Sequence, residues 1–519
     1  MSRRHAGVMA PVFSLASARG WGIGEFPDLA PFSRWLASAG FDRLMLLPVG
    51  PLAGGDTSPY GAASAMAIDP IYIALDQVPE FTHRGGAAAL SSGAREAIDR
   101  ARTSARIDYA AVRAAKHEAL ARAFDVFAGE EWEQLTLRAA DFAGYLSRER
   151  WWLDDFALYQ AIATALGLAN WRDWPPPLRD RSPSALDEAR RTLSKELLRY
   201  QYLQWVAESQ WQQARRDVRA HGVTLYGDLP FMVSVAGPDV WVRPDEFMLD
   251  VRLGVPPDAF SATGQDWGLP TYLWWRIREH GYGWMRQRAR RMAALYDGYR
   301  VDHLVGLYRT FGRPPDGEPF FNPADQPEQV AQGEALLTIF RESGVPIIAE
   351  DLGVVPDFVR ASMARLGVPG CKVMRWERDW QAPGQPFVDP ERYPAVSAAM
   401  SGTHDTETLA GWWTSAAPGE REAIAQLAGL DAGEPWSPRV HERLLERLYR
   451  AGSSELFLPL PDVFGSSDRI NVPATVGDHN WTWRLPWPVD ELDRHHEPLR
   501  RAEQCRGLAA FAARGLLGG

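Results

Sequence analysis

The chain repeats one local pattern, a helix followed directly by a short apolar run, and this pattern limits the folds that it can adopt. In the first example a helical segment begins at Asp28, a suitable N-cap, ends at Gly40 and is followed by the apolar run 41–49. Mainly apolar runs of this length are typical of strands that are buried on both faces in a parallel sheet. The other such runs are 223–229, 298–303, 345–352, 371–376 and 395–405. Their alternation with helical segments predicts an α/β fold around a parallel sheet.

Ionisable side chains lie at the ends of four of these runs: Asp228, Asp302, Glu350 and Asp405. In a (β/α)8 barrel, the TIM barrel, the carboxyl ends of all strands converge on one mouth, where catalytic groups lie. A doubly wound open sheet also gathers strand ends on one side, so it stays an alternative at this point. The pattern favours the barrel.

The stretch 85–220 differs from the rest, because its sequence is helical and rich in Ala, Glu and Arg. We expect it to form a mainly helical insertion subdomain within a single catalytic barrel over residues 1–519. Its last segment opens at Ser182 and Pro183, a good N-cap and first-turn pair, and runs toward Gly222. That segment is too long to be predicted as one straight helix.

The charge of the chain argues against two kinds of partner. Its 56 Lys and Arg and 66 Asp and Glu give a net charge of −10, and no block of like charge forms a polybasic arm. Nucleic acid and membrane surfaces are therefore not expected as partners. The one short basic cluster lies in a helical pattern and is interpreted as a solvated helix face. It consists of Arg286, Arg288, Arg290 and Arg291.

The remaining composition predicts a cytoplasmic protein. The N-terminal residues show no signal-peptide pattern, and nowhere do eighteen apolar residues run together. Cys371 and Cys505 form neither a disulfide framework nor a metal-binding set, which suits a reducing compartment. The 22 tryptophans are expected mostly in the core, but indole rings also stack well on sugar rings, which favours a saccharide enzyme. The oligomeric state does not follow from these features.

The run 298–303 contains the first candidate for catalysis. Arg300 and Asp302 are two residues apart on a predicted strand, so their side chains share a face. A guanidinium beside Asp302 would hold its carboxylate ionised and oriented, as a nucleophile for an anomeric carbon must be. Considered alone, a purely structural Arg–Asp pair is the favoured alternative.

The run 345–352 ends in two adjacent acids, Glu350 and Asp351. Neighbouring residues on a strand face opposite ways, so only one of them can point into the site. We expect this to be Glu350, whose pKa an apolar surrounding and the nearby Asp302 would raise, as a proton donor requires. The alternative, that both acids cap the next helix or pair with arginines, is equally supported by this run alone.

The third candidate is the strand end Thr403, His404, Asp405 and Thr406. His404 can hydrogen-bond a sugar hydroxyl, and Asp405 can bind the 2- and 3-hydroxyls of a ring that flattens toward an oxocarbenium ion. A His beside an Asp is more often a structural pair, but three acids on separate strand ends of one mouth favour catalysis. Two carboxyls about 5–5.5 Å apart would give retention through a covalent glycosyl-enzyme, whereas a wider gap would leave room for water and give inversion; the sequence does not set this distance.

Other chemistries lack their motifs in this chain. The sequence contains no HExxH, CxxC, Walker or GxSxG motif, and the glycines of 20–24 follow no predicted strand. No metal site and no nucleotide loop are therefore expected.

The ordered set of motifs resembles glycoside hydrolase family 77, the amylomaltases or disproportionating enzymes, over nearly the whole chain. The segments 22–26, 47–51, 58–60, 227–231, 254–258, 264–268, 469–475 and 480–484 carry the resemblance together with the three strand ends. It implies a metal-free, cofactor-free 4-α-glucanotransferase that acts on α-1,4-glucans and maltooligosaccharides. The alternatives are a mainly hydrolytic α-glucanase with the same triad and a non-catalytic glucan-binding protein.

The resemblance also implies roles for individual residues. Asp302 would be the nucleophile, Glu350 the acid/base and Asp405 the transition-state stabiliser. Residues expected to bind the substrate are Tyr60, Asp228, Arg300, His303, His404, Phe260, Trp267 and Asn480. Of these, Tyr60 matches an aromatic that stacks on the sugar, and Phe260 and Trp267 lie in a loop that covers bound glucan; rim packing is the alternative role for such aromatics.

Three stretches depart from the family pattern: 306–321, 375–378 and 406–408. None contains a residue of the proposed triad. Chain-length preference and the ratio of transfer to hydrolysis are therefore the properties that these departures affect.

Overall fold

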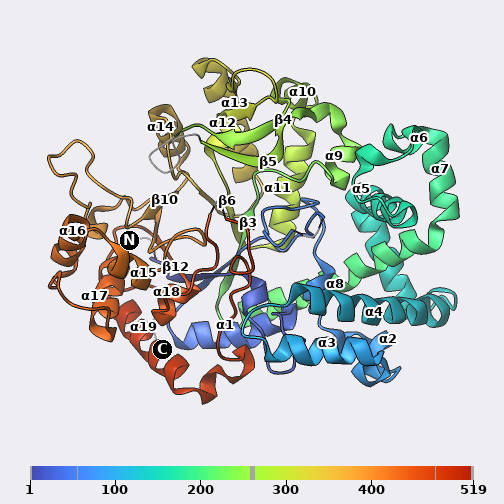
Figure 1. Cartoon of the computed structure of the whole chain (residues 1–519), viewed down its shortest axis with the longest axis horizontal. Coiled ribbons are helices and arrows are strands. Elements are labelled where there is room, and N and C mark those ends of the chain that lie inside the picture. Colours follow the sequence, from blue (N-terminus) through green and yellow to red (C-terminus); the bar gives the residue numbers. More distant parts are fainter. Residues whose placement is uncertain (1–2, 55, 258–263, 474, 516–519) are drawn as a thin grey trace.

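The computed structural model describes residues 3–54, 56–257, 264–473 and 475–515, and its centre is a closed barrel of eight parallel strands (Figure 1). The strands follow the order β1-β12-β11-β10-β9-β6-β3-β2, and β1 pairs with both β2 and β12, which closes the ring. Their bounds are β1 Gly7–Ala10, β2 Arg43–Leu46, β3 Thr224–Leu229, β6 Gly298–Val301, β9 Ile347–Ala349, β10 Gly370–Val373, β11 Ser397–Met400 and β12 Glu455–Pro459. The (β/α)8 barrel is confirmed, and the open sheet is excluded because no barrel strand forms an edge.

Helices surround this barrel. Those that lie outside the long β2–β3 connection are α1 Leu29–Ser38, α9 Pro238–Val242, α10 Trp274–Glu279, α11 Gly283–Leu295, α12 Val305–Tyr308, α13 Gln326–Arg341, α14 Asp357–Leu366, α15 Leu409–Ser415, α16 Pro418–Ala428, α17 Pro438–Tyr449, α18 Leu460–Phe464 and α19 His496–Phe511. Asp28 precedes α1 as expected, but its carboxylate accepts bonds from the Glu25 amide and from Arg19, and does not cap α1. Gly40 ends the helical region with a φ of 84°, a conformation that glycine adopts without strain.

Seven helices fill the connection between β2 and β3, on the right of Figure 1. They are α2 Pro79–Thr82, α3 Ser92–Thr103, α4 Tyr109–Val126, α5 Leu137–Leu166, α6 Pro176–Arg179, α7 Pro183–Thr192 and α8 Ser194–Ala220. The long segment that opens at Ser182 is divided at Leu193 into α7 and α8. Because α8 packs on α1 and β3 as well as on α5, the end of the predicted 85–220 subdomain is shared with the barrel.

A second, antiparallel sheet lies beside the barrel strands, in the order β5-β4-β7-β8. Its strands are β4 Phe247–Val255, β5 Gln265–Tyr272, β7 Thr310–Arg313 and β8 Phe320–Asn322. The sequence pattern did not predict these strands, and the stretch interpreted as a covering loop is largely the β4–β5 hairpin. The hairpin follows the carboxyl end of β3, so it belongs to the mouth side of the barrel.

The prediction of a solvated basic face on α11 was wrong for two of its arginines. Arg288 and Arg291 are 2% and 1% exposed. Arg288 donates to the carbonyl oxygens of Pro230 and Phe231, and Arg291 forms an ion pair of 2.8 Å with Glu208. Buried guanidiniums keep several donors occupied in this way, and Arg288 thereby fixes the segment that follows β3.

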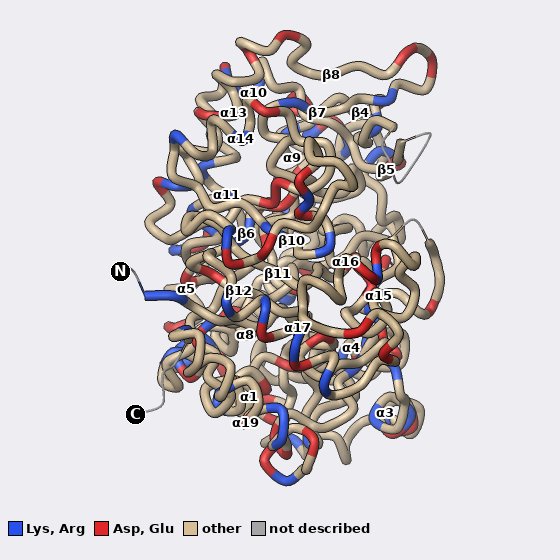
Figure 2. Tube along the Cα trace, turned by 90° about the vertical axis from the view of Figure 1, so that its left-hand side faces the viewer, with Lys and Arg blue, Asp and Glu red and all other residues tan. Residues whose placement is uncertain are grey.

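The surface carries charges of both signs. Figure 2 shows Lys and Arg interspersed with Asp and Glu over the whole trace, without a large region of one sign. None of the helices in the described residues is long and apolar enough to span a membrane.

Candidate active site

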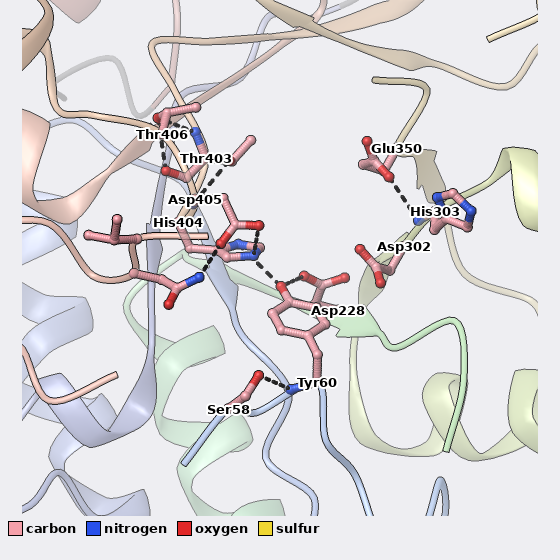
Figure 3. A network of polar contacts seen from close by, with 12 residues as sticks. Ser58, Tyr60, Asp228, Asp302, His303, Glu350, Thr403, His404, Asp405 and Thr406 are labelled. Atoms are coloured by element: carbon pink, nitrogen blue, oxygen red, sulfur yellow. Dashed lines mark hydrogen bonds and ion pairs between the residues drawn. The ribbon is translucent and has the colours of Figure 1, made fainter. Parts of the chain in front are cut away.

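The acidic residues of the site lie on or just after neighbouring barrel strands. Asp228 lies in β3, Asp302 directly follows β6 and Glu350 directly follows β9, and these three strands are adjacent in the barrel. Asp405 follows β11 on the opposite side of the mouth, where Figure 3 shows it facing the other acids across Tyr60. The barrel therefore brings together side chains that are up to 177 residues apart in the sequence, from 228 to 405.

Asp302 forms the predicted contact with Arg300. The Arg300 Nη2 donates to Asp302 Oδ1 over 2.9 Å and to Asp228 Oδ2 over 2.7 Å, so one guanidinium joins two strands. Burial nevertheless raises the pKa of Asp302 to about 6, and Arg300, the next largest influence, lowers it. The guanidinium therefore orients the carboxylate, but it does not outweigh burial as the sequence argument expected.

Glu350 is held by backbone amides. Its Oε2 accepts from the His303 amide over 2.8 Å and its Oε1 from the Leu352 amide over 3.0 Å. Burial raises the pKa of Glu350 to about 7; Arg300 opposes this shift and Asp302 adds to it. Asp351 points the other way and accepts from the Cys371 amide over 2.8 Å, as expected for neighbouring residues at a strand end.

Asp405 has a different environment. Its Oδ1 accepts from Asn471 Nδ2 over 2.7 Å, and its Oδ2 lies 3.3 Å from His404 Nε2. Burial acts to raise its pKa, but His404 and Asn471 outweigh it and lower the pKa of Asp405 to about 2. Asp405 is therefore ionised across the range in which Asp302 and Glu350 titrate.

Tyr60 connects the two sides of the mouth. Its hydroxyl donates to Asp228 Oδ2 over 2.7 Å, accepts from Arg300 Nη2 over 3.1 Å and lies 3.2 Å from His404 Nδ1. The ring stacks on His404 with the centroids 4.7 Å apart and the planes inclined by 23°. The predicted residues Tyr60, Asp228, Arg300 and His404 thus form one hydrogen-bonded network. Figure 3 shows Tyr60 between Asp228 and His404 in this network.

His303 lies beside the acids with an unusual backbone. Its φ is 45°, and its amide points toward Glu350. Its ring packs edge-on against the rings of Trp267 and Phe231, with centroid distances of 4.7 Å and 5.3 Å. Burial lowers the pKa of His303 to about 4, so the ring is neutral near pH 7. Trp267 therefore reaches the site from β5, whereas Phe260 lies outside the described residues.

Asn480 bonds to its own loop and to none of these site side chains. It is 4% exposed, and its amide is bonded to Val472 and Thr475, so it holds the loop that carries Asn471. The sequence argument did not assign Asn471, Arg469 or Phe231 to the site. The first two belong to the 469–475 motif, but only the fold shows that Asn471 reaches Asp405 and that Arg469 donates to the Asp405 carbonyl over 2.7 Å.

The arrangement can perform paired carboxyl chemistry. The Glu350 carboxyl is bonded to the amide of the residue next to Asp302, and burial raises the pKa values of both acids toward neutral pH, to about 7 for Glu350 and about 6 for Asp302. Such a pair supplies a proton donor and an anionic nucleophile near neutral pH. Among the described residues, no group of three or more His, Cys, Asp or Glu is arranged to hold a metal ion.

Comparisons with known proteins show the family of the chain. The family model described as 4-alpha-glucanotransferase matches residues 10–490. The 4-alpha-glucanotransferase of Thermus thermophilus is 34% identical over 507 residues, covering 92% of this chain and 94% of its own, and that of a Synechocystis species is 32% identical over 503 residues, covering 93% and 94%. Among solved structures, the amylomaltase from Streptococcus agalactiae in complex with acarbose superposes with a TM-score of 0.83 at 27% identity, covering 99% of this chain and 100% of that one.

Proposed function

Because this chain belongs to glycoside hydrolase family 77, the family of the 4-alpha-glucanotransferases, we propose that Asp302, Glu350 and Asp405 carry out its glucan transfer. The chain is an enzyme of the 4-alpha-glucanotransferase type, and neither the mainly hydrolytic nor the non-catalytic alternative is favoured by its relatives. The observation that carries the residue assignment is the bond from the His303 amide to Glu350, which fixes the proton donor beside the nucleophile.

In the first step Asp302 attacks the anomeric carbon of an α-1,4-linked glucose while Glu350 protonates the glycosidic oxygen. The carbon–oxygen bond breaks, the departing glucan leaves with a free 4-hydroxyl, and a covalent glycosyl ester forms on Asp302. The raised pKa of Glu350, about 7, keeps the proton available near neutral pH, and Arg300 orients the attacking carboxylate.

In the second step the ionised Glu350 accepts the proton of an incoming 4-hydroxyl. That oxygen bonds to the anomeric carbon, and Asp302 leaves as a carboxylate, so a new α-1,4 linkage forms with retained configuration. Proton and charge are balanced, because the proton given in the first step is recovered in the second.

Asp405 stabilises the transition state in this scheme. Its carboxylate, which stays ionised because its pKa is about 2, binds the 2- and 3-hydroxyls of the reacting ring more strongly as that ring flattens. Tyr60 and His404 offer the stacked aromatic surface on which the ring rests, and Asp228 holds Tyr60 and Arg300 in place.

The substrates that fit this scheme are α-1,4-glucans and maltooligosaccharides. Transfer requires that an acceptor sugar be held at the mouth better than water is, which is the role we assign to Trp267 and the β4–β5 hairpin. The S. agalactiae amylomaltase was solved in complex with acarbose. A cytoplasmic location is supported by Cys371 and Cys505, which are both buried and unpaired.

Incubation with maltotriose tests the proposal. We expect glucose together with a ladder of longer oligomers, because each transfer lengthens one glucan while it shortens another. A product mixture that contains only glucans shorter than maltotriose would show that water is the main acceptor. Unchanged maltotriose with a folded protein would contradict the enzymatic function itself.

A further inference from the structure

The segment that carries Asp405 is connected to a neighbouring strand end by an ion pair that the mechanism does not use. Arg375 follows β10, and its Nη2 lies 3.0 Å from Glu407 Oε2 on the segment that follows β11. Glu407 also accepts from Ser415 Oγ over 3.3 Å. Two residues before Glu407 is Asp405, whose carbonyl accepts from Arg469 Nη2.

Charges alternate through this cluster. Burial lowers the pKa of Arg469; Glu407 and Asp405 raise it, while Arg375 lowers it further. The four groups are therefore close enough to influence one another. Glu407 is the anion that pairs with Arg375 over 3.0 Å and also raises the pKa of Arg469, so removing its charge leaves both guanidiniums without this anion.

Packing alone does not hold this segment. Asp462 fixes its two ends, because it accepts from Ser401 Oγ over 2.6 Å and from the Leu409 amide over 2.7 Å. Between these ends lies a cavity of about 10 Å³, lined in part by Thr403, His404, Thr406 and Glu407.

We propose that the Arg375–Glu407 ion pair positions Asp405 against the reacting sugar ring. This inference rests on the proposed function of Asp405, and it makes Arg375 and Glu407 positioning residues that do not touch the substrate. The pair joins two of the stretches in which the chain departs from the family pattern, 375–378 and 406–408, so they act as one unit.

Single and double variants test this coupling. We expect Glu407→Gln and Arg375→Gln each to lower kcat on maltotriose roughly fivefold, as for the loss of one partly buried ion pair, with KM changed less than twofold. The double variant should lose no more than either single variant, because all three lack the same contact. Losses that multiply in the double variant, or single variants with the kcat of the unmodified enzyme, would overturn the proposal.

The chain offers a matched control on the same segment. Arg378 lies 3.1 Å from Glu420 on α16, with side-chain exposures of 19% and 31%, against 16% and 35% for Arg375 and Glu407. The control pair binds α16 and not the Asp405 segment. We expect Arg378→Gln to change kcat less than twofold; an equal loss in both variants would indicate that any ion pair of this segment merely stabilises the fold, and would contradict positioning.

A donor whose reacting ring lacks the 2-hydroxyl separates this inference from the proposed function. On the normal donor, Asp405→Asn must lose activity, otherwise the assignment of Asp405 itself fails. If Asp405→Asn is impaired, the activities of the unmodified enzyme and of Glu407→Gln are compared on the 2-deoxy donor. Their ratio should fall toward one, because this donor lacks the 2-hydroxyl that Asp405 binds. A ratio that is the same on both donors would refute the positioning role and leave the assignment of Asp405 intact.

Discussion

Two glutamates have pKa values raised by burial to about 7: Glu350, which is partly exposed at the barrel mouth, and Glu25, which is buried near the N-terminus. Their partners differ. Glu25 forms an ion pair of 2.7 Å with Lys116 of α4, and both side chains are 2% exposed. Lys116 also donates to the carbonyls of Ile71 and Ile73, so its donors are all occupied. Glu350 forms no ion pair among the described residues, and only backbone amides bind it.

This difference separates a structural acid from a catalytic one. The charge of Glu25 is balanced inside a closed contact that joins the helical connection to the start of the chain. The charge of Glu350 has no ion-pair partner among the described residues: Arg300 favours it without an ion pair, and Asp302, a second acid with 21% of its side chain exposed, opposes it. A perturbed pKa therefore indicates function only where the protein has not already balanced the charge.

The largest expected effect comes from Asp302→Asn. An amide cannot attack the anomeric carbon, so transfer should fall by about four orders of magnitude, while the hydrogen bond to Arg300 and the melting temperature are largely kept. The measurement is glucose release from maltotriose at equal concentrations of folded protein. Turnover close to that of the unmodified enzyme would exclude Asp302 as the nucleophile and remove the contrast between the two glutamates.

Lys116→Met should lower the stability of the protein around Glu25 and leave the activity at the barrel mouth unchanged. Removing one partner of a buried ion pair leaves Glu25 without its counter-charge and two carbonyl oxygens without their donor, which should lower the free energy of unfolding by about 3–5 kcal/mol. Activity per folded molecule should stay unchanged, because Lys116 does not contact the mouth. Denaturant unfolding measures the free energy, and kcat measured at low denaturant gives the activity of the folded protein. A lower kcat per folded molecule would show that the two regions are coupled.

The pH dependence of kcat/KM sharpens the comparison further. Asp302 must be ionised, so the rate should rise as pH increases through about 6; Glu350 must be protonated, so the rate should fall as pH increases through about 7. Because the two acids interact, the two pKa values of the profile belong to the pair. Well below the lower pKa kcat/KM should rise about tenfold per pH unit, and well above the higher pKa it should fall about tenfold per pH unit. The Lys116→Met variant should give the same bell-shaped pH profile of kcat/KM. If the higher pKa of this profile shifted in the variant, that pKa would belong to Glu25 and not to Glu350.

The sequence predicted the parts of this comparison that depend on local pattern. Long apolar runs with acids at their ends located six barrel strands and the positions of Asp302, Glu350 and Asp405. It missed β1 Gly7–Ala10 and β12 Glu455–Pro459, although both are longer than the located strand β9 Ile347–Ala349. It missed the antiparallel sheet, because the pairing of β4 with β5 contains register shifts that break the alternation expected of a hairpin.

Contacts between distant segments were the second kind of miss. Burial of Arg288 depends on carbonyls 57 and 58 residues away, and the bond from Asn471 to Asp405 spans 66 residues. Such contacts require the closed barrel, so no local pattern reports them. The same holds for Asp302, where the neighbouring Arg300 was visible in the sequence but the larger effect of burial was not.

The smallest expected effect is that of Trp267→Ala, which removes the edge-on contact with His303 and part of the proposed acceptor surface. One aromatic contact contributes enough to change the rate of transfer about three- to tenfold, far less than the loss of an acid. The hydrolysed share of the product should rise, since water gains when the acceptor sugar is held less well. Trp275→Ala is the control, because Trp275 on α10 is 49% exposed and is not assigned to the site. If both variants shift the ratio of transfer to hydrolysis equally, Trp267 has no special role at the mouth, and the acceptor surface must be sought among other side chains.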